Sequence, residues 1–427
     1  MKQKIKLLLS TLIIIFIFTE ITITILVEKD LDSNLSLSHV HLKPYQLPIK
    51  ETKKKIEDLL GHKVPDSLMQ NYDENGFKRE YFNVRLLPDS ILGWSPSPIY
   101  KSKDGLYIYN RDGIRCEDIL TEFSEKNKLR IAIFGDSYAH GDEVKFENTI
   151  GKYLQNLLKK QNIETVVLNF AVSGYGIDQA FKRWELIKEK FQPDIVILGV
   201  QFENVKRHIN LLRPFYYYIT EIPYSKPRFV ISENKLQYLE NPIHDVTKTV
   251  SIIEDFDNWK FSSSEGFYNK MNYESNPFYI SNSISFVSSA ISQIFNEIDY
   301  YDSRSESYSI TYKIIENFSR SVRNENGIFI PLHLPVMNDF DFVTQNFLDI
   351  FYDQKFIYDD LFSALKLEYN FVEPYDLLNE WGEKNGFEKI FMKRHYSPIA
   401  NKIIAERVFE FLKSGYPEII TNKDGIK

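Results

Sequence analysis

Cysteine is almost absent from this chain, with Cys116 the single one among 427 residues. A lone cysteine excludes an intrachain disulfide framework and any cysteine-rich zinc or iron–sulfur site. A surplus of basic residues is also missing, since 52 lysines and arginines stand against 59 aspartates and glutamates, a formal net charge of −7. Such a chain has no excess of positive charge to displace counterions from phosphates, which argues against a nucleic-acid binder.

Metal-ligand patterns are missing as well. The eight histidines are scattered, and none of their spacings is typical of a metal site. We therefore expect neither a metal nor an organic cofactor. What the chain does have is 43% hydrophobic and 15% aromatic residues, which is enough for a buried core. The length allows two or three domains.

A long apolar run occupies residues 7–27, where 15 of 21 side chains are Leu, Ile, Phe or Val and the one charged residue is Glu20. About 20 apolar residues span a bilayer as a helix. Three lysines precede the run, which predicts a cytoplasmic N-terminus at 1–6 and places the rest of the chain outside. A cleaved signal peptide is an alternative, although no small-x-small cleavage site follows. A buried helix of a soluble protein is a third.

The remaining chain divides into two parts. Residues 28–90 have no clean period and predict a stalk or irregular extension, with a short helix at 52–60. Residues 91–427 predict one α/β domain. Within it, residues 215–305 are rich in Tyr, Phe, Ser and Asn and interrupt the pattern, so we expect an insertion with a small sheet or loops.

Apolar runs alternate with amphipathic segments through the domain. Such alternation predicts βαβ units and a parallel sheet buried on both faces. The expected strands are 129–136, 165–172, 193–200, 327–336 and 370–374, and the expected helices are 147–161, 177–190, 308–324, 358–369 and 397–412.

Polar residues follow the strands where ligands of open parallel sheets bind. Ser137 follows the first strand in Gly-Asp-Ser, Gly174 the second, and Asn204 the third, while His395 precedes the last helix. A hydroxyl, a glycine N–H, an amide and an imidazole are the groups that acyl transfer needs. Each alone is equally explained by turn or cap chemistry; together they predict an active site.

These motifs resemble those of the SGNH hydrolases, also called the GDSL esterase/lipase family, over roughly residues 90–427. The resemblance implies a flavodoxin-like α/β/α fold and ester hydrolysis. It implies Ser137 as nucleophile, Gly174 and Asn204 as oxyanion-hole donors, and His395 as general base. Leu92–Pro96, Asn110–Arg115 and Arg213–Phe215 also resemble the membrane-anchored bacterial branch of the family.

Two positions depart from the family pattern. Met392 stands where the acid that orients the histidine is usual, and Val205 follows Asn204 where aspartate is usual. We therefore expect a Ser137–His395 dyad, with a backbone carbonyl or another carboxylate orienting the ring. Asp376 and Glu388 are near His395 in sequence, which is weak support for either.

The sequence thus predicts a serine esterase in a bacterial cell membrane, with a single span and an extracytoplasmic catalytic domain. The expected partners are the membrane and an acyl ester or acylated carbohydrate, with no nucleic acid. Two alternatives stay open: an O-acyltransferase that modifies exported polysaccharide, and a catalytically silent glycan-binding or assembly protein. The acyl group, the alcohol and the oligomeric state are not predicted.

Overall fold

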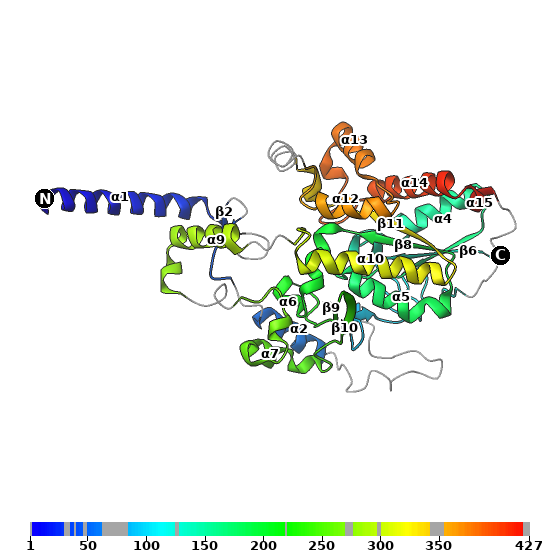
Figure 1. The fold of residues 1–427 in the computed structure, drawn as a ribbon, viewed down its shortest axis with the longest axis horizontal. Coiled ribbons are helices and arrows are strands. Elements are labelled where there is room, and N and C mark those ends of the chain that lie inside the picture. Colours follow the sequence, from blue (N-terminus) through cyan, green and yellow to red (C-terminus); the bar gives the residue numbers. More distant parts are fainter. Residues whose placement is uncertain are drawn as a thin grey trace.

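A computed structural model describes residues 2–29, 35–37, 40–45, 49–61, 84–123, 128–217, 220–269, 276–296, 300–341 and 354–421. Figure 1 shows a globular α/β part from which one long helix, α1, extends.

The central sheet has four parallel strands in the order β11-β8-β6-β7. A parallel bridge from Leu332 to Val372 adds a fifth position beside β11. Numbered along the chain, this is the order 2-1-3-4-5 of the flavodoxin-like fold. Nearly every strand residue is buried, which is why the strands are continuous apolar runs. Their bounds are β6 Leu129–Phe134, β7 Thr165–Asn169, β8 Ile195–Val200 and β11 Ile328–His333.

Two pairs of helices make this a three-layer α/β/α structure, as expected. Helices α4 (Ile150–Lys160) and α14 (Pro398–Gly415) pack together on one side of the sheet, and α5 (Ile177–Phe191) and α10 (Glu306–Asn324) contact each other on the opposite side (Figure 1). Their apolar stripes meet the strands in a single large core.

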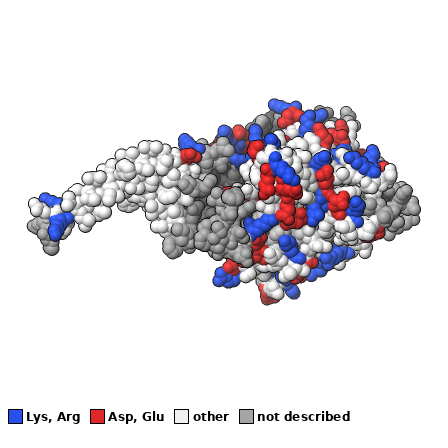
Figure 2. All heavy atoms as spheres, turned by 90° about the horizontal axis from the view of Figure 1, so that it is seen from above, with Lys and Arg blue, Asp and Glu red and all other residues white. Residues whose placement is uncertain are grey.

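Helix α1 (Lys2–Leu26) confirms the expected apolar helix, and its stretch Gln3–Leu26 is long and apolar enough to cross a membrane. None of its most apolar window is buried against the rest of the protein, so the alternative of a soluble core helix does not hold. Figure 2 shows an uncharged surface along this helix with basic side chains at its far end.

Helix α9 (Asn282–Asn296) contacts α1 although more than 250 residues separate them in sequence (Figure 1). The Glu20 carboxylate accepts hydrogen bonds from the Ser281 hydroxyl at 2.6 Å and from the backbone N–H groups of Asn282 and Ser283 at 2.8 and 3.0 Å. These N–H groups lie in the first turn of α9, where no helical carbonyl is available, so Glu20 caps α9 from another helix.

Part of the predicted extension 28–90 packs on the domain rather than standing apart from it. Leu59 of α2 (Ile49–Gly61) and Leu86 of β4 (Leu86–Asp89) share an apolar cluster with Trp94 of β5 (Gly93–Pro96) and with residues that follow β7. The short strands β1 (Glu28–Lys29), β2 (Leu35–Leu37) and β3 (Val40–His41) form a separate small sheet. Helix α2 confirms the expected helix at 52–60.

The expected insertion has its own two-stranded sheet, formed by β9 (Arg228–Ser232) and β10 (Lys235–Leu239). Its helices besides α9 are α6 (Arg213–Tyr216) and α7 (Thr249–Glu254). Its short 3-10 helices are η3 (Val246–Lys248), η4 (Phe256–Asn258), η5 (Ser262–Ser264) and η6 (Pro277–Ile280), while η2 (Phe202–Ile209) precedes the insertion.

Two expectations near the C-terminal end need correction. The expected strand 370–374 is reduced to the single bridge at Val372, because a proline follows two residues later and a helix begins directly after it. That helix, α13 (Tyr375–Asn385), was not expected. The remaining elements are α3 (Ser137–His140), η1 (Phe146–Asn148), η7 (Met337–Phe340), α12 (Asp359–Glu368), η8 (Phe387–Lys389) and α15 (Pro417–Thr421).

Candidate active site

Ser137 begins α3 directly after β6, at the carboxyl edge of the sheet. The turn depends on Gly135, whose φ of 146° and distance of 2.8 Å from an added Cβ to Ala139 leave no room for a side chain. Asp136 caps α3, because its carboxylate accepts the Tyr138 N–H at 2.9 Å. The Ser137 side chain is half-buried, and its hydroxyl has no hydrogen-bond partner among the residues that the structure describes.

His395 lies beside this turn, although 258 positions separate it from Ser137. Its ring centre is 5.1 Å from that of Tyr138, the residue after Ser137, and the Tyr138 hydroxyl donates to the Arg394 carbonyl at 2.8 Å. The structure therefore brings the two predicted catalytic segments together. No hydrogen bond joins Ser137 Oγ to His395 in the described part of the chain, so the dyad stays a prediction.

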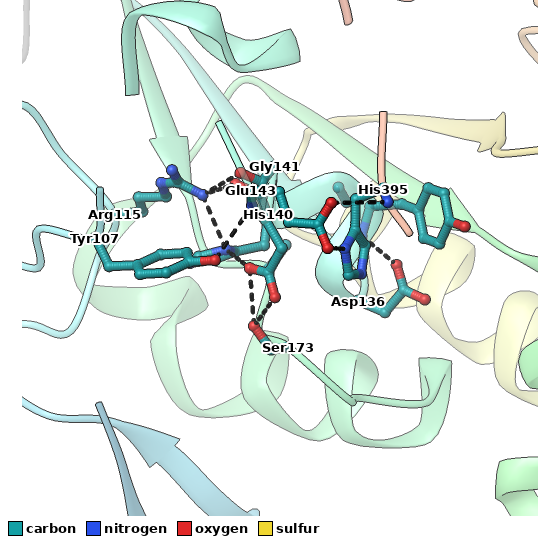
Figure 3. Close-up of polar contacts among 12 residues, drawn as sticks. Tyr107, Arg115, Asp136, His140, Gly141, Glu143, Ser173 and His395 are labelled. Atoms are coloured by element: carbon teal, nitrogen blue, oxygen red, sulfur yellow. Dashed lines mark hydrogen bonds and ion pairs between the residues drawn. The ribbon is translucent and has the colours of Figure 1, made fainter. Parts of the chain in front are cut away.

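The carboxylate that faces His395 belongs to Glu143, which the sequence did not single out. Its Oε1 lies 3.1 Å from Nδ1 of His395, an ion-pair distance without the angle of a full hydrogen bond. Its Oε2 accepts the backbone N–H groups of Lys393 and Arg394 at 2.8 and 3.0 Å. In Figure 3 the two oxygens point to the imidazole and its turn. Glu143 thus lies where an acid could orient the His395 ring, in place of the acid that the family usually has at the position of Met392.

The electrostatics of Glu143 fit that position. Partial burial raises the pKa of its carboxyl, but the Arg394 N–H and the contact with His395 outweigh burial and lower the pKa below its usual 4.5. The two acids considered from sequence lie elsewhere: Asp376 pairs with Lys355 at 2.9 Å, and Glu388 is exposed. Met392, at the usual acid position, is half-exposed.

A buried network holds the loop that carries Glu143. Nη1 of Arg115 donates to the carbonyls of His140 and Gly141 at 2.8 and 2.6 Å. His140 Nδ1 lies 2.6 Å from Asp142 Oδ1, and this carboxylate also accepts the Ser173 hydroxyl at 2.7 Å (Figure 3). His140 is fully buried and packs inside this network. Arg115 belongs to the motif Asn110–Arg115, which thus fixes the loop that carries Glu143 by hydrogen bonds.

Gly174 follows β7 with a φ of 82°, a left-handed conformation that glycine adopts without strain. The neighbouring carbonyl of Ser173 accepts the Trp94 indole N–H at 3.0 Å, and the Tyr175 hydroxyl donates to the Trp94 carbonyl at 2.6 Å. Trp94 of the motif Leu92–Pro96 therefore holds the residues on both sides of Gly174, the predicted oxyanion-hole glycine, by hydrogen bonds.

Asn204 is buried in η2, close to the candidate nucleophile. Its amide nitrogen donates to Asp136 Oδ2 and to Gln201 Oε1. The Asn204 amide, which we expected to donate to an oxyanion, therefore already donates a hydrogen bond to Asp136, the residue before Ser137. Burial raises the pKa of Asp136, while the nearby Arg207 charge opposes that rise. The role of Asn204 as a donor to substrate remains a prediction.

Within the described ranges, no three His, Cys, Asp or Glu side chains are grouped so that they could hold a metal ion. Cys116 is buried and unpaired with another cysteine, and burial raises the pKa of its thiol to about 12. A thiol that stays protonated is a poor nucleophile. Ser137 is therefore the better placed candidate for covalent chemistry.

No protein-family profile matches the chain, and no curated protein matches it in sequence. Solved structures similar to it include an acetyl xylan esterase from Geobacillus stearothermophilus, at 12% identity and TM-score 0.34 over 70% of this chain and 97% of that one. A lipase/acylhydrolase from Enterococcus faecalis has 10% identity and TM-score 0.34 over 67% and 96%. A lipolytic protein of the G-D-S-L family from Veillonella parvula has 10% identity and TM-score 0.33 over 66% and 96%.

These similar structures are ester hydrolases, and one carries the name of the family that the motifs indicate. With TM-scores below 0.5 they carry no argument about residues or substrates. The residue assignments therefore depend on the geometry of this chain alone.

Proposed function

We propose that this chain is a serine esterase of the SGNH type that removes O-acyl groups from cell-surface carbohydrate. The observation that carries the proposal is the position of His395, which packs against the residue after Ser137 and whose Nδ1 lies 3.1 Å from the Glu143 carboxylate. With Nδ1 facing a carboxylate, a neutral ring carries its proton there and leaves Nε2 as the base.

In the proposed reaction, Nε2 of His395 takes the proton of Ser137 Oγ as Oγ attacks the ester carbonyl carbon. The N–H groups of Ser137 and Gly174, with the Asn204 amide once released from Asp136, donate to the oxyanion. One such donor is worth roughly 3–4 kcal/mol. His395 then protonates the departing alcohol as the carbon–oxygen bond breaks. Water attacks the acyl-enzyme, again through His395, and Ser137 recovers its proton.

Anchoring is the second part of the proposal. Helix α1 spans the bacterial cell membrane once, with residues 1–6 in the cytoplasm and the α/β domain on the outer side. The length and exposure of α1 and the lysines before it support this arrangement. The α/β domain can then reach O-acylated carbohydrate at the cell surface.

Labelling with a fluorophosphonate probe tests the nucleophile. We expect the full-length protein in detergent to be labelled at Ser137, as located by peptide mass spectrometry, and Ser137→Ala to be unlabelled. Ser251→Ala, at an exposed serine of the insertion, is the matched control and should label normally. A folded wild-type protein that resists the probe would favour the silent binding or assembly protein.

A second assay separates hydrolysis from transfer. The protein is incubated with an acetyl donor, with and without a glycan acceptor, and the products are identified by mass spectrometry. Free acetate in both reactions supports the esterase. Acetylated glycan, formed only with acceptor present, would make the protein an O-acyltransferase that uses the same residues.

A further inference from the structure

Two arginines, Arg213, which is buried, and Arg207, which is largely buried, lie against the turns that carry Gly174 and Ser137. Arg213 begins α6 and is only 8% exposed, and its Nη1 lies 3.4 Å from the Gly174 carbonyl oxygen. Arg207, in η2, donates from Nη1 to the Tyr175 carbonyl at 2.6 Å. A guanidinium has five N–H donors, and Nε of both arginines has no hydrogen-bond partner in the described residues. Both side chains therefore keep donating capacity unused.

The charge of these arginines is not balanced. Asp136 is the one carboxylate at ion-pair distance from either of them within the described ranges, 3.6 Å from Arg207 Nη1. Among the residues that the structure describes, Arg213 has no carboxylate at that distance. Burial, followed by repulsion from Arg207, lowers the pKa of Arg213 to about 9. A buried cation is costly unless it is paired, so this position is one that a bound anion would stabilise.

Two half-buried tyrosines connect this cluster to the exposed Arg394, which precedes His395. The Arg213 guanidinium carbon lies 5.2 Å from the ring centre of Tyr216 and 5.8 Å from that of Tyr217. Arg394 lies 5.9 Å from the Tyr217 ring and donates to its hydroxyl. Guanidinium groups over ring faces keep their in-plane N–H donors available for a planar anion. The cluster therefore extends from the Gly174 turn to the His395 turn.

We propose that Arg213 and Arg207 form a binding site for an anionic group of the substrate, a carboxylate or a phosphate, adjacent to the ester that Ser137 attacks. The inference builds on the proposed function and narrows its substrate class to acyl esters on negatively charged carbohydrate. Arginine binds both anions through paired N–H donors, so the two sources share one chemistry. Arg207 and Arg213 are specificity residues in this scheme, and neither takes part in proton transfer.

The test measures binding of inorganic phosphate to the full-length protein in detergent by isothermal titration calorimetry, which needs no ester turnover. We expect Arg213→Gln to weaken phosphate binding by at least about tenfold. Arg213→Lys, which keeps the charge, should fall between it and the wild type. The matched control is Arg304→Gln, because Arg304 is 89% exposed and pairs with Asp302. Circular dichroism verifies that each variant is folded. If Arg213→Gln does not fold, Arg207→Gln is measured in its place.

A wild-type protein that binds no phosphate at tens of millimolar, or variants that bind it as well as the wild type, would overturn the inference. Competition with glucuronate and with glycerol 3-phosphate then identifies the preferred anion. A purely structural role for Arg213 would lower ester turnover but leave phosphate binding unchanged. Because binding is measured without turnover, failure of the esterase proposal is seen separately, as an unlabelled Ser137.

Discussion

At the scale of single residues, the most informative position is Glu143. A carboxylate that accepts from Nδ1 fixes the tautomer of a catalytic histidine and stabilises the imidazolium that forms when it takes a proton. Here the Glu143 carboxylate lies 3.1 Å from Nδ1 of His395 and accepts two N–H groups of the turn that holds this histidine. In the proposed mechanism, this one side chain sets both the position of the base and its tautomer, without the acid three residues before the histidine.

Replacement of this acid should impair turnover far more than binding. We expect Glu143→Gln to lower kcat for 4-nitrophenyl acetate roughly 10²-fold with little change in KM, because an amide keeps the size of the side chain but loses the charge and one of the two acceptor oxygens. The effect should be smaller than for a fully buried acid, since water reaches Glu143. Glu143→Asp should recover part of the activity.

The control for that measurement is Glu147→Gln, a nearby acid on η1 without a role in the turn. Equal rates for Glu143→Gln and the wild type would exclude Glu143 as the positioning acid. They would leave a dyad in which water or a backbone group orients His395.

At the scale of elements, the contact between α1 and α9 places two segments with exposed apolar side chains next to each other. The exposed Phe278 and Ile280 precede α9, and Val287 and Ile291 lie on it, so this segment presents apolar side chains beside the helix that we propose spans the membrane. Its first turn is capped by Ser281, whose hydroxyl accepts the Ile284 N–H at 3.2 Å, and also by Glu20 of α1. The Glu20 cap is an N-terminal acceptor supplied from another helix.

Loss of this cap should loosen α9 selectively. We expect Glu20→Ala to increase hydrogen–deuterium exchange at the amides of Asn282 and Ser283, because a lost cap costs about 1 kcal/mol. Glu20→Gln, which keeps an acceptor, should show a smaller increase. Thr22→Ala is the matched control, since the Thr22 hydroxyl donates to the Phe18 carbonyl of the same helix at 2.9 Å. Unchanged exchange in Glu20→Ala would contradict the capping role.

At the scale of the whole molecule, two buried histidines make stability depend on pH. Burial, with the Arg115 charge acting in the same direction, lowers the pKa of His140 from 6.5 to about 3. Burial lowers that of His208 from 6.5 to about 4. Below pH 6.5 the unfolded chain binds protons at both sites and the folded chain does not. Stability is therefore fully present above pH 6.5 and declines as the pH falls toward these values.

The expected slope is up to about 1.4 kcal/mol per pH unit for each histidine. The measurement is the thermal unfolding midpoint of the full chain between pH 7 and about pH 5, a window in which most carboxylates stay ionised. His208→Asn should flatten the profile. His244→Asn, at an exposed histidine, should leave it unchanged. A wild-type midpoint that stays constant across this window would contradict the prediction.

Local patterns in the sequence were enough for much of this protein. The apolar run of α1, the buried strands β6, β7, β8 and β11, and the position of Ser137 after a strand all follow from periods of one to four residues, which the backbone geometry imposes. The parallel order of the sheet follows from the alternation of strands and helices. Helix α13 was missed, because its weak apolar pattern comes directly after a strand-like segment.

Only the tertiary structure decided which side chains meet at the carboxyl edge of the sheet. Glu143 reaches a turn 250 residues later, Arg213 lies against Gly174, and the Asn204 amide is bonded to Asp136. No sequence period relates such partners, because the path of the chain between them includes several crossovers and an insertion. Their chemistry depends on distance and burial in space, and these quantities exist only once the chain is folded.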